Sequence, residues 1–170
     1  TITKISKNIR PMDKNLYSHY TWSILGDGCM QEGVTYGSAS LAAHLKLNKL
    51  IWYYDKNEQQ ISGSINRAYS EDTQKVFEGI GWHVQTIDGH DRQMISTAIA
   101  QGKEELSRPS LIIGKTTIGS GLATMEGSHQ THGAPLPDQE RLASKKKLGI
   151  PEGKDFYWPE EIAVQFKSHF

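Results

Sequence analysis

The sequence lacks several features by which common classes of protein are recognised. Cys29 is the only cysteine, which excludes an intramolecular disulfide and a zinc site built from several thiolates, and favours a reducing, intracellular setting. No apolar run reaches the roughly 18 residues that a membrane helix needs. Residues 1–10, TITKISKNIR, lack the apolar core of a signal peptide. We therefore expect a cytoplasmic protein with no membrane partner.

An excess of charge of either sign is also absent. The 19 Lys and Arg side chains balance the 19 Asp and Glu side chains, so the formal net charge is zero. Proteins that bind nucleic acids usually carry clustered positive charge, and this balance gives no indication of such a partner. The length of 170 residues favours a single domain. Because the first residue is Thr1 rather than Met, we expect further sequence upstream of it.

Short apolar runs alternate with longer amphipathic stretches. We expect strands at 20–26, 49–55, 82–87 and 110–117, and helices at 33–47, 70–81, 91–106, 137–149 and 159–170. This alternation is typical of an α/β fold in three layers, with a parallel sheet covered by helices on both faces. Ser70 and Asp91 stand where N-caps of two of these helices are expected.

The segments that follow the strands are the places to look for a site, because ligands of parallel sheets bind at the carboxyl ends of the strands. One of these segments is unusually long. Residues 118–137, IGSGLATMEGSHQTHGAPLP, are too rich in Gly, His and Pro for a regular helix or strand. Loops of about 20 residues in compact domains are usually functional or disordered, and we expect a loop of the kind found at active sites.

An acid stands between two glycines where the first strand ends. Gly26 and Gly28 would let a ligand approach the backbone around Asp27, and the helix expected next offers free N–H groups to an anion. A carboxylate beside phosphates requires a cation between them, and Mg²⁺ prefers such oxygen ligands. Asn57 follows the next strand, with 28 residues between it and Gly28. We therefore expect Asp27 and Asn57 to share a magnesium ion that holds a diphosphate.

This pair of motifs and five longer segments resemble the diphosphate-binding domain of transketolase, a thiamine diphosphate enzyme. The segments are GDGCMQEG, SLAAHLKLNKLI, GWHVQTIDGHD, RPSLIIGKTTIGSG and GSHQTHGAPL, and the resemblance extends from about Tyr20 to the end of the chain. Other thiamine enzymes share the GDG and Asn pair, whereas the segment around HGAPL is more specific. The resemblance implies thiamine diphosphate and Mg²⁺ as cofactors and sugar phosphates as substrates.

The resemblance also implies roles for individual residues near the cofactor. Asp27 and Asn57 would bind Mg²⁺ through their side chains and Gln59 through its main-chain carbonyl. Gly28 would donate its N–H to the diphosphate beside Gly26. Ile61 would line the thiazolium pocket, although its position alone favours an ordinary core residue.

Two further residues resemble catalytic residues of the family. His132 would lie near the diphosphate and the sugar, where an imidazole can position substrate and move protons; a role for His129 is less clearly implied. Glu32 resembles a buried acid in a network that joins the two active sites of a homodimer, but an acid at a helix start also stabilises the helix by itself. Relatives commonly carry an acid where this chain has Gly37.

The expected reaction is the transfer of a two-carbon ketol unit between sugar phosphates. The chain resembles only the later part of one domain, and the pyrimidine-binding and C-terminal domains of the family are absent from it. We therefore expect negligible turnover from the chain alone and expect it to act within a larger enzyme. Three departures, Gly37, Lys56 and Gln59, leave open a degenerate, non-catalytic interaction module; relatives commonly have an acid in place of Lys56 and an aliphatic residue in place of Gln59. Another thiamine enzyme, such as a dihydroxyacetone or deoxyxylulose synthase, is a further alternative.

Overall fold

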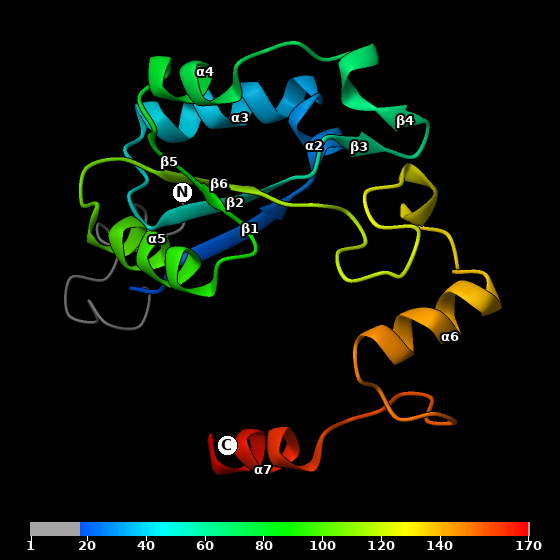
Figure 1. Ribbon diagram of the computed structural model, residues 1–170. Coiled ribbons are helices and arrows are strands. Elements are labelled where there is room, and N and C mark those ends of the chain that lie inside the picture. The colour runs from blue at the N-terminus through cyan, green and yellow to red at the C-terminus, as the bar shows by residue number, and fades with distance from the viewer. Residues whose placement is uncertain (1–17, 170) are drawn as a thin grey trace. The chain divides into compact units, whose positions relative to one another are not determined.

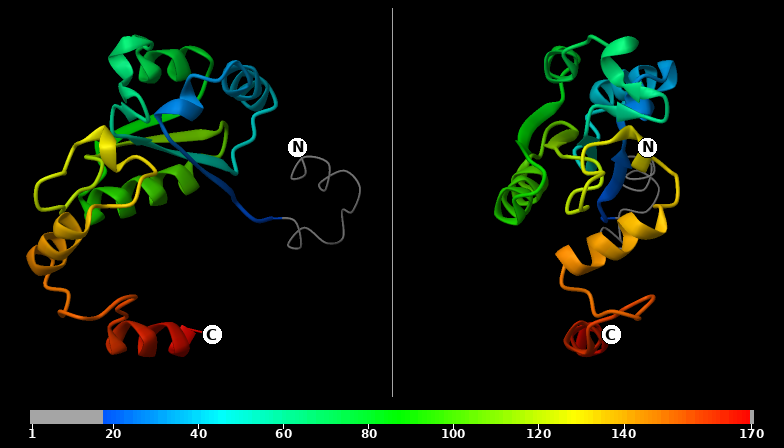
Figure 2. Two further views of the ribbon diagram at one scale, coloured as in Figure 1. Left: turned by 90° about the vertical axis from the view of Figure 1, so that its right-hand side faces the viewer. Right: turned by 45° about the vertical axis from the view of Figure 1, so that its right-hand side comes forward.

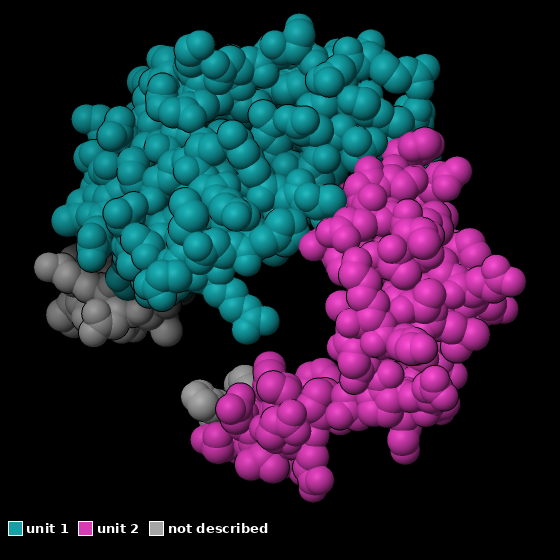
Figure 3. Space-filling view, in the orientation of Figure 1, with its two compact units in different colours: residues 1–117 teal, residues 118–170 magenta. Residues whose placement is uncertain are grey.

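The computed structural model describes residues 18–169, and the chain divides into two compact units, residues 1–117 and 118–170 (Figure 3). Residues 1–10, where the sequence predicts no signal peptide, lie outside the described residues. Within residues 18–169, every helix is too short or too polar to cross a membrane.

The first unit contains a parallel sheet between two layers of helices (Figures 1 and 2). Its elements are, in chain order, β1 (Thr21–Leu25), α2 (Asp27–Met30), α3 (Gly33–His44), β2 (Leu50–Lys56), β3 (Gln59–Gln60), β4 (Gly63–Ser64), η1 (Ile65–Arg67), α4 (Thr73–Gly79), β5 (His83–Asp88), α5 (Arg92–Glu104) and β6 (Ser110–Lys115). The four-stranded sheet has the order β1-β2-β6-β5, and all its neighbouring strands are parallel. The predicted α/β class, with helices on both faces of a parallel sheet, is confirmed.

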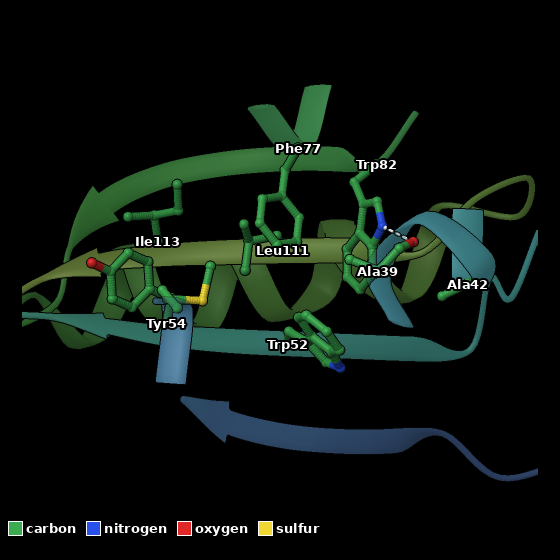
Figure 4. Packing of buried hydrophobic residues seen from close by; sticks show 9 residues of the cluster. Ala39, Ala42, Trp52, Tyr54, Phe77, Trp82, Leu111 and Ile113 are labelled. Atoms are coloured by element: carbon green, nitrogen blue, oxygen red, sulfur yellow. Dashed lines mark hydrogen bonds between the residues drawn. The ribbon is translucent and has the colours of Figure 1, made fainter. Parts of the chain in front are cut away.

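The larger part of the core lies between the sheet and helices α3 and α4 (Figure 4). The rings of Trp52 on β2 and Trp82 lie 4.7 Å apart, and Phe77 on α4 meets Trp82 edge-on at 5.3 Å. Trp82 also donates its indole N–H to the carbonyl of Ala39 on α3 at 2.9 Å. Aromatic pairs of this kind add to the stabilisation from buried area, so β2 and β6 are held firmly beneath the two helices.

The opposite face of the sheet is covered by α5. A smaller cluster forms there from Ile51, Ile87, Ala98 and Ile112. Since β6 lies between β2 and β5 and α-helices cover both faces, the residues of β6 up to Gly114 are buried. Rigid central strands of this kind fix the positions of the loops that follow them.

The helix starts agree only in part with the sequence. Asp91 caps α5 as predicted, accepting the N–H groups of Gln93 and Met94 at 2.8 and 3.1 Å. The cap expected at Ser70 is wrong, because Asp72 is the N-cap of α4 and accepts the N–H of Lys75 at 3.2 Å. A carboxylate two residues further on therefore takes the role assigned to Ser70.

The second unit consists of a long loop and two helices. The loop contains the single 3₁₀ turn η2 (His129–Thr131), and the helices are α6 (Asp138–Lys147) and α7 (Glu160–His169), close to the two predicted ranges. The buried carboxylate of Glu140 on α6 accepts the N–H groups of Thr124 and Met125 and the hydroxyl of Thr124. Side chains of α6 therefore hold the loop that precedes it.

Candidate functional site

The carboxyl ends of β1 and β2 lie side by side. The two strands pair in parallel with Leu25 opposite Tyr54, so the segments after Leu25 and after Lys56 leave the sheet at the same edge. Asp27 is the first residue of α2, directly after Gly26, which has an extended backbone. Asn57 is the first residue after β2. The topology therefore brings together the two residues that the sequence singles out.

The carboxylate of Asp27 is buried at this edge, with only 3% of the residue exposed. Its Oδ1 accepts the hydroxyl of Tyr54 at 2.6 Å, and its Oδ2 accepts the N–H groups of Asn57 at 3.2 Å and Glu58 at 2.9 Å. Burial raises the pKa of Asp27; these three hydrogen bonds lower it, and the nearby charge of Asp55 raises it. The acid is thus taken out of water next to a second acid.

Asp55 and Asn57 form the other side of the site. Asp55 accepts the hydroxyl of Thr116, which follows β6, and the side-chain amide of Asn57 at 3.5 Å. The amide oxygen of Asn57 accepts the N–H of Gln59 at 3.0 Å. The ends of three adjacent strands, β1, β2 and β6, therefore contribute to one polar cluster.

A divalent cation fits this cluster. Among residues 18–169, neither Asp27 nor Asp55 takes part in an ion pair; the nearby Lys56 pairs with Glu58 at 3.7 Å. A buried carboxylate without a cationic partner is costly, and carboxylate and amide oxygens are the ligands Mg²⁺ prefers. In the same part of the chain, no group of three or more His, Cys, Asp and Glu side chains could hold a metal ion. A cation here would depend on the amide of Asn57, a main-chain carbonyl such as that of Gln59, and oxygens of a ligand.

The glycines beside Asp27 leave room for a ligand. A Cβ atom built on either Gly26 or Gly28 would meet no other atom within 4 Å. The longer helix, α3, starts only at Gly33. The helix directly after Gly26 is α2, which is shorter than the sequence suggests and has only four residues. The N–H groups of its first turn have no partner within the helix, so an anion would bind to individual N–H groups rather than to the dipole of a long helix.

Two predicted residues near the cluster are exposed. Ile61 connects the short strands β3 and β4 and is 77% exposed, so the interpretation as an ordinary core residue is wrong. Glu32 is the N-cap of α3 but makes no side-chain capping bond, and it is exposed. Their assignments to the thiazolium pocket and to an acid network between subunits stay predictions.

The two predicted histidines belong to the second unit. His129 begins η2 and His132 follows directly after it as its C-cap, and both are exposed. The turn is held by the N–H of His132, which donates to the carbonyl of His129 at 2.9 Å, and by Ser128, whose hydroxyl accepts the N–H of Gln130. The imidazole of His132 is therefore presented on a defined turn, and its role in catalysis stays a prediction.

Three members of the cluster were not predicted from the sequence: Tyr54, Asp55 and Thr116. Tyr54 reads as one more apolar strand residue, and only the structure shows its hydroxyl on Asp27. A signal existed for the other two, because Asp55 and Thr116 each stand at the carboxyl end of an expected strand. Without the sheet order, however, the two strands could not be known to be neighbours.

Comparisons with known proteins agree on one family. The family described as "Transketolase, thiamine diphosphate binding domain" matches residues 3–170. Transketolase 1 of Escherichia coli (strain K12) is 41% identical over 155 residues, which are 91% of this chain and 23% of that protein. The chain spans about a fifth of the length of the curated relatives it matches.

Solved structures give the same result. Transketolase from Campylobacter jejuni matches with a TM-score of 0.91 and 36% identity, over 97% of this chain and 26% of that one. Transketolase from Pichia stipitis in complex with sedoheptulose 7-phosphate matches with a TM-score of 0.84 and 37% identity, over 88% of this chain and 22% of that one.

Proposed function

The chain belongs to the transketolase family, and we propose that it holds the magnesium and diphosphate of thiamine diphosphate within a larger enzyme that transfers two-carbon ketol units between sugar phosphates. The observation that carries this proposal is the buried carboxylate of Asp27, which lies beside Asp55 and Asn57 and has no basic partner among residues 18–169. Such a cluster is favourable when a dication joins it to an anionic ligand.

In this proposal Asp27 and Asn57 bind Mg²⁺ through side-chain oxygens and Gln59 through its carbonyl. Tyr54 and the N–H groups of Asn57 and Glu58 fix the carboxylate of Asp27 in one orientation, since they occupy both of its oxygens from the protein side. Each carboxylate oxygen has further lone pairs for a metal.

The ligand has room beside this metal site. Gly26 and Gly28 leave space for the diphosphate, and the N–H of Gly28 donates to it. Ile61, exposed on the β3–β4 turn, would cover part of the thiazolium ring. When bound, thiamine diphosphate supplies the centre that stabilises a carbanion of the substrate.

Two residues are proposed to act on substrate or between subunits. His132 would hold a proton at a substrate hydroxyl, a role that an exposed imidazole on an ordered turn can perform. Glu32 would belong to the acid network between two subunits. Its exposed position at the start of α3, two residues before the exposed apolar residue Val34, is compatible with a place at a subunit contact.

The proposed partners are the remaining parts of the enzyme and a second subunit, forming a homodimer. Apolar side chains are uncovered on β1, where Ile24 is 80% exposed, and on α3, where Val34 and Leu41 are 76% and 56% exposed. The spacing of seven residues puts Val34 and Leu41 on one face of α3, and apolar patches on a protein surface mark interaction sites. Sugar phosphates are the proposed substrates, as the ligand of the Pichia stipitis structure suggests, and the proposed location is the cytoplasm.

Calorimetry with a series of ligands tests the proposal. If the chain is a magnesium-diphosphate anchor, thiamine diphosphate and inorganic pyrophosphate will bind with similar affinity in the presence of Mg²⁺, and thiamine will not bind. Removal of Mg²⁺ with a chelator will abolish both signals. Binding of thiamine alone, or binding that ignores the metal, would contradict the anchor.

A turnover assay separates the anchor from a complete enzyme. With a ketose phosphate, an aldose phosphate, Mg²⁺ and thiamine diphosphate, we expect negligible ketol transfer by the chain alone. Readily measured turnover would contradict its role as one part of a larger enzyme. Failure of the full-length parent protein to bind thiamine diphosphate would favour the degenerate interaction module instead, for which Gly37, Lys56 and Gln59 are the relevant departures.

A further inference from the structure

One amide beside the site has no partner. The side-chain Nε2 of Gln60 is buried and makes no hydrogen bond, and no other buried side-chain nitrogen or oxygen among residues 18–169 shares this state. An unpaired buried donor lowers stability, and native proteins rarely retain one without a reason. Gln60 therefore needs an explanation that the fold alone does not supply.

Its place in the chain ties Gln60 to the polar cluster. It lies in β3, three residues after Asn57, and β3 contacts α2, the helix that begins with Asp27. The backbone before it is held at several points: Glu58 donates its N–H to Asp27 at 2.9 Å, and the carbonyl of Glu58 accepts the N–H of Ile65 at 3.1 Å. The strand that carries the unpaired amide is thus fixed to the carboxylate of the site.

The chemistry of the cluster suggests what this donor is for. The nearest basic side chain of the segment, Lys56, already pairs with Glu58 at 3.7 Å. A bound diphosphate presents acceptor oxygens only, and a primary amide nitrogen is a donor only. A neutral donor adds a hydrogen bond to a phosphate oxygen without changing the charge balance between Mg²⁺ and the acids.

We infer that Gln60 is a ligand-binding residue whose side-chain amide donates to an oxygen of the diphosphate. This inference rests on the proposed function and adds to the predicted set a residue that acts by its side chain, whereas the neighbouring Gln59 acts by its carbonyl. It implies that the unliganded chain gives up stability at Gln60 and regains it when the anion binds.

A pair of Gln→Met variants tests this, because Met has a similar shape and lacks the amide. In Gln60→Met the unpaired donor is gone, so the Tm of the unliganded chain should rise by roughly 2–6 °C, while the Kd for pyrophosphate in the presence of Mg²⁺ should increase about 10-fold or more. A gain in stability together with a loss of affinity distinguishes binding from a merely structural role, which would leave the Kd unchanged.

Gln85→Met is the matched control. Gln85 is also half-buried, but its Nε2 donates to the carbonyl of Ala98 at 3.0 Å, so this variant should lower the Tm and leave the Kd for pyrophosphate unchanged. Gln60→Glu, which places a carboxylate against the anion, should weaken binding more than Gln60→Met does.

The outcomes separate the inference from the proposed function. If the unaltered chain binds pyrophosphate with Mg²⁺ and Gln60→Met binds it equally well, the inference fails and the anchor stands. A lowered Tm in Gln60→Met, with or without weaker binding, also overturns the inference, because the amide would then be paired within the fold. If the unaltered chain does not bind, the anchor fails, and the inference fails with it.

Discussion

Replacing Tyr54 with Phe removes one atom from the centre of the site. Tyr54 is fully buried, and its hydroxyl donates to Oδ1 of Asp27 at 2.6 Å. A hydrogen bond to a charged group contributes about 1.5–3 kcal/mol to stability. The carboxylate keeps the two N–H donors on Oδ2, so the loss should stay within this range and correspond to a fall in Tm of roughly 3–12 °C.

The neighbouring residue provides the control. Tyr53 lies next to Tyr54 on β2, but its side chain points to the other face of the sheet and its hydroxyl makes no hydrogen bond in the described part of the chain. Tyr53→Phe should therefore change the free energy of unfolding by well under 1 kcal/mol. Chemical denaturation of both variants gives the comparison. Equal losses, or a larger loss in Tyr53→Phe, would show that the carboxylate of Asp27 does not depend on the hydroxyl of Tyr54.

Three further changes test other parts of the structure. Gly114→Ala would place a Cβ atom 2.1 Å from the hydroxyl of Tyr53 and should cost about 1–3 kcal/mol of unfolding free energy. The same substitution should cost less when it is made in a Tyr53→Ala background, where the clashing ring is absent. Glu58 has a φ of 62°, so Glu58→Gly should raise the unfolding free energy by about 0.5–1 kcal/mol, and Glu58→Ala, which keeps a Cβ atom, should not; equal effects would contradict backbone strain. Hydrogen bonds from the hydroxyl and N–H of Thr124, with others from the loop and α6, lower the pKa of Glu140 from 4.5 to about 2. The stability that Glu140 contributes is therefore present above pH 4.5 and is lost as the pH falls towards 2. The protection of the Thr124 amide against exchange, measured relative to an unstructured peptide at the same pH, should fall over this range, and Glu140→Gln should remove this pH dependence.

The sequence predicted the layers of the fold because they follow from local patterns. Apolar runs such as 110–117 have the length of buried strands, and the amphipathic stretches between them require a sheet to pack on. The order β1-β2-β6-β5 did not follow, because the strands that pair with β6 are chosen by packing over long distances along the chain. The hairpin of β3 and β4 was also missed, since strands of two residues show no periodicity.

The candidate site was predictable to a similar degree. Asp27 and Asn57 stand out because each is a polar residue directly after an apolar run, and the structure places them at adjacent strand ends. The hydroxyl of Tyr54 and the left-handed backbone of Glu58 gave no signal, because a Tyr in a strand and a Glu in a loop are both ordinary residues. Such contacts depend on the direction of side chains and N–H groups, which spacing along the sequence does not specify.

The most direct test of the account is to locate the cation. In NMR spectra of the chain with pyrophosphate, Mn²⁺ in place of Mg²⁺ broadens the amide signals of residues close to the metal. If Asp27 and Asn57 share the metal, residues 27–28 and 57–59 will lose their signals first, and Asp27→Ala will abolish this selective effect. Broadening centred on another strand end, such as residues 88–91, or on no defined place, would contradict a metal shared by Asp27 and Asn57.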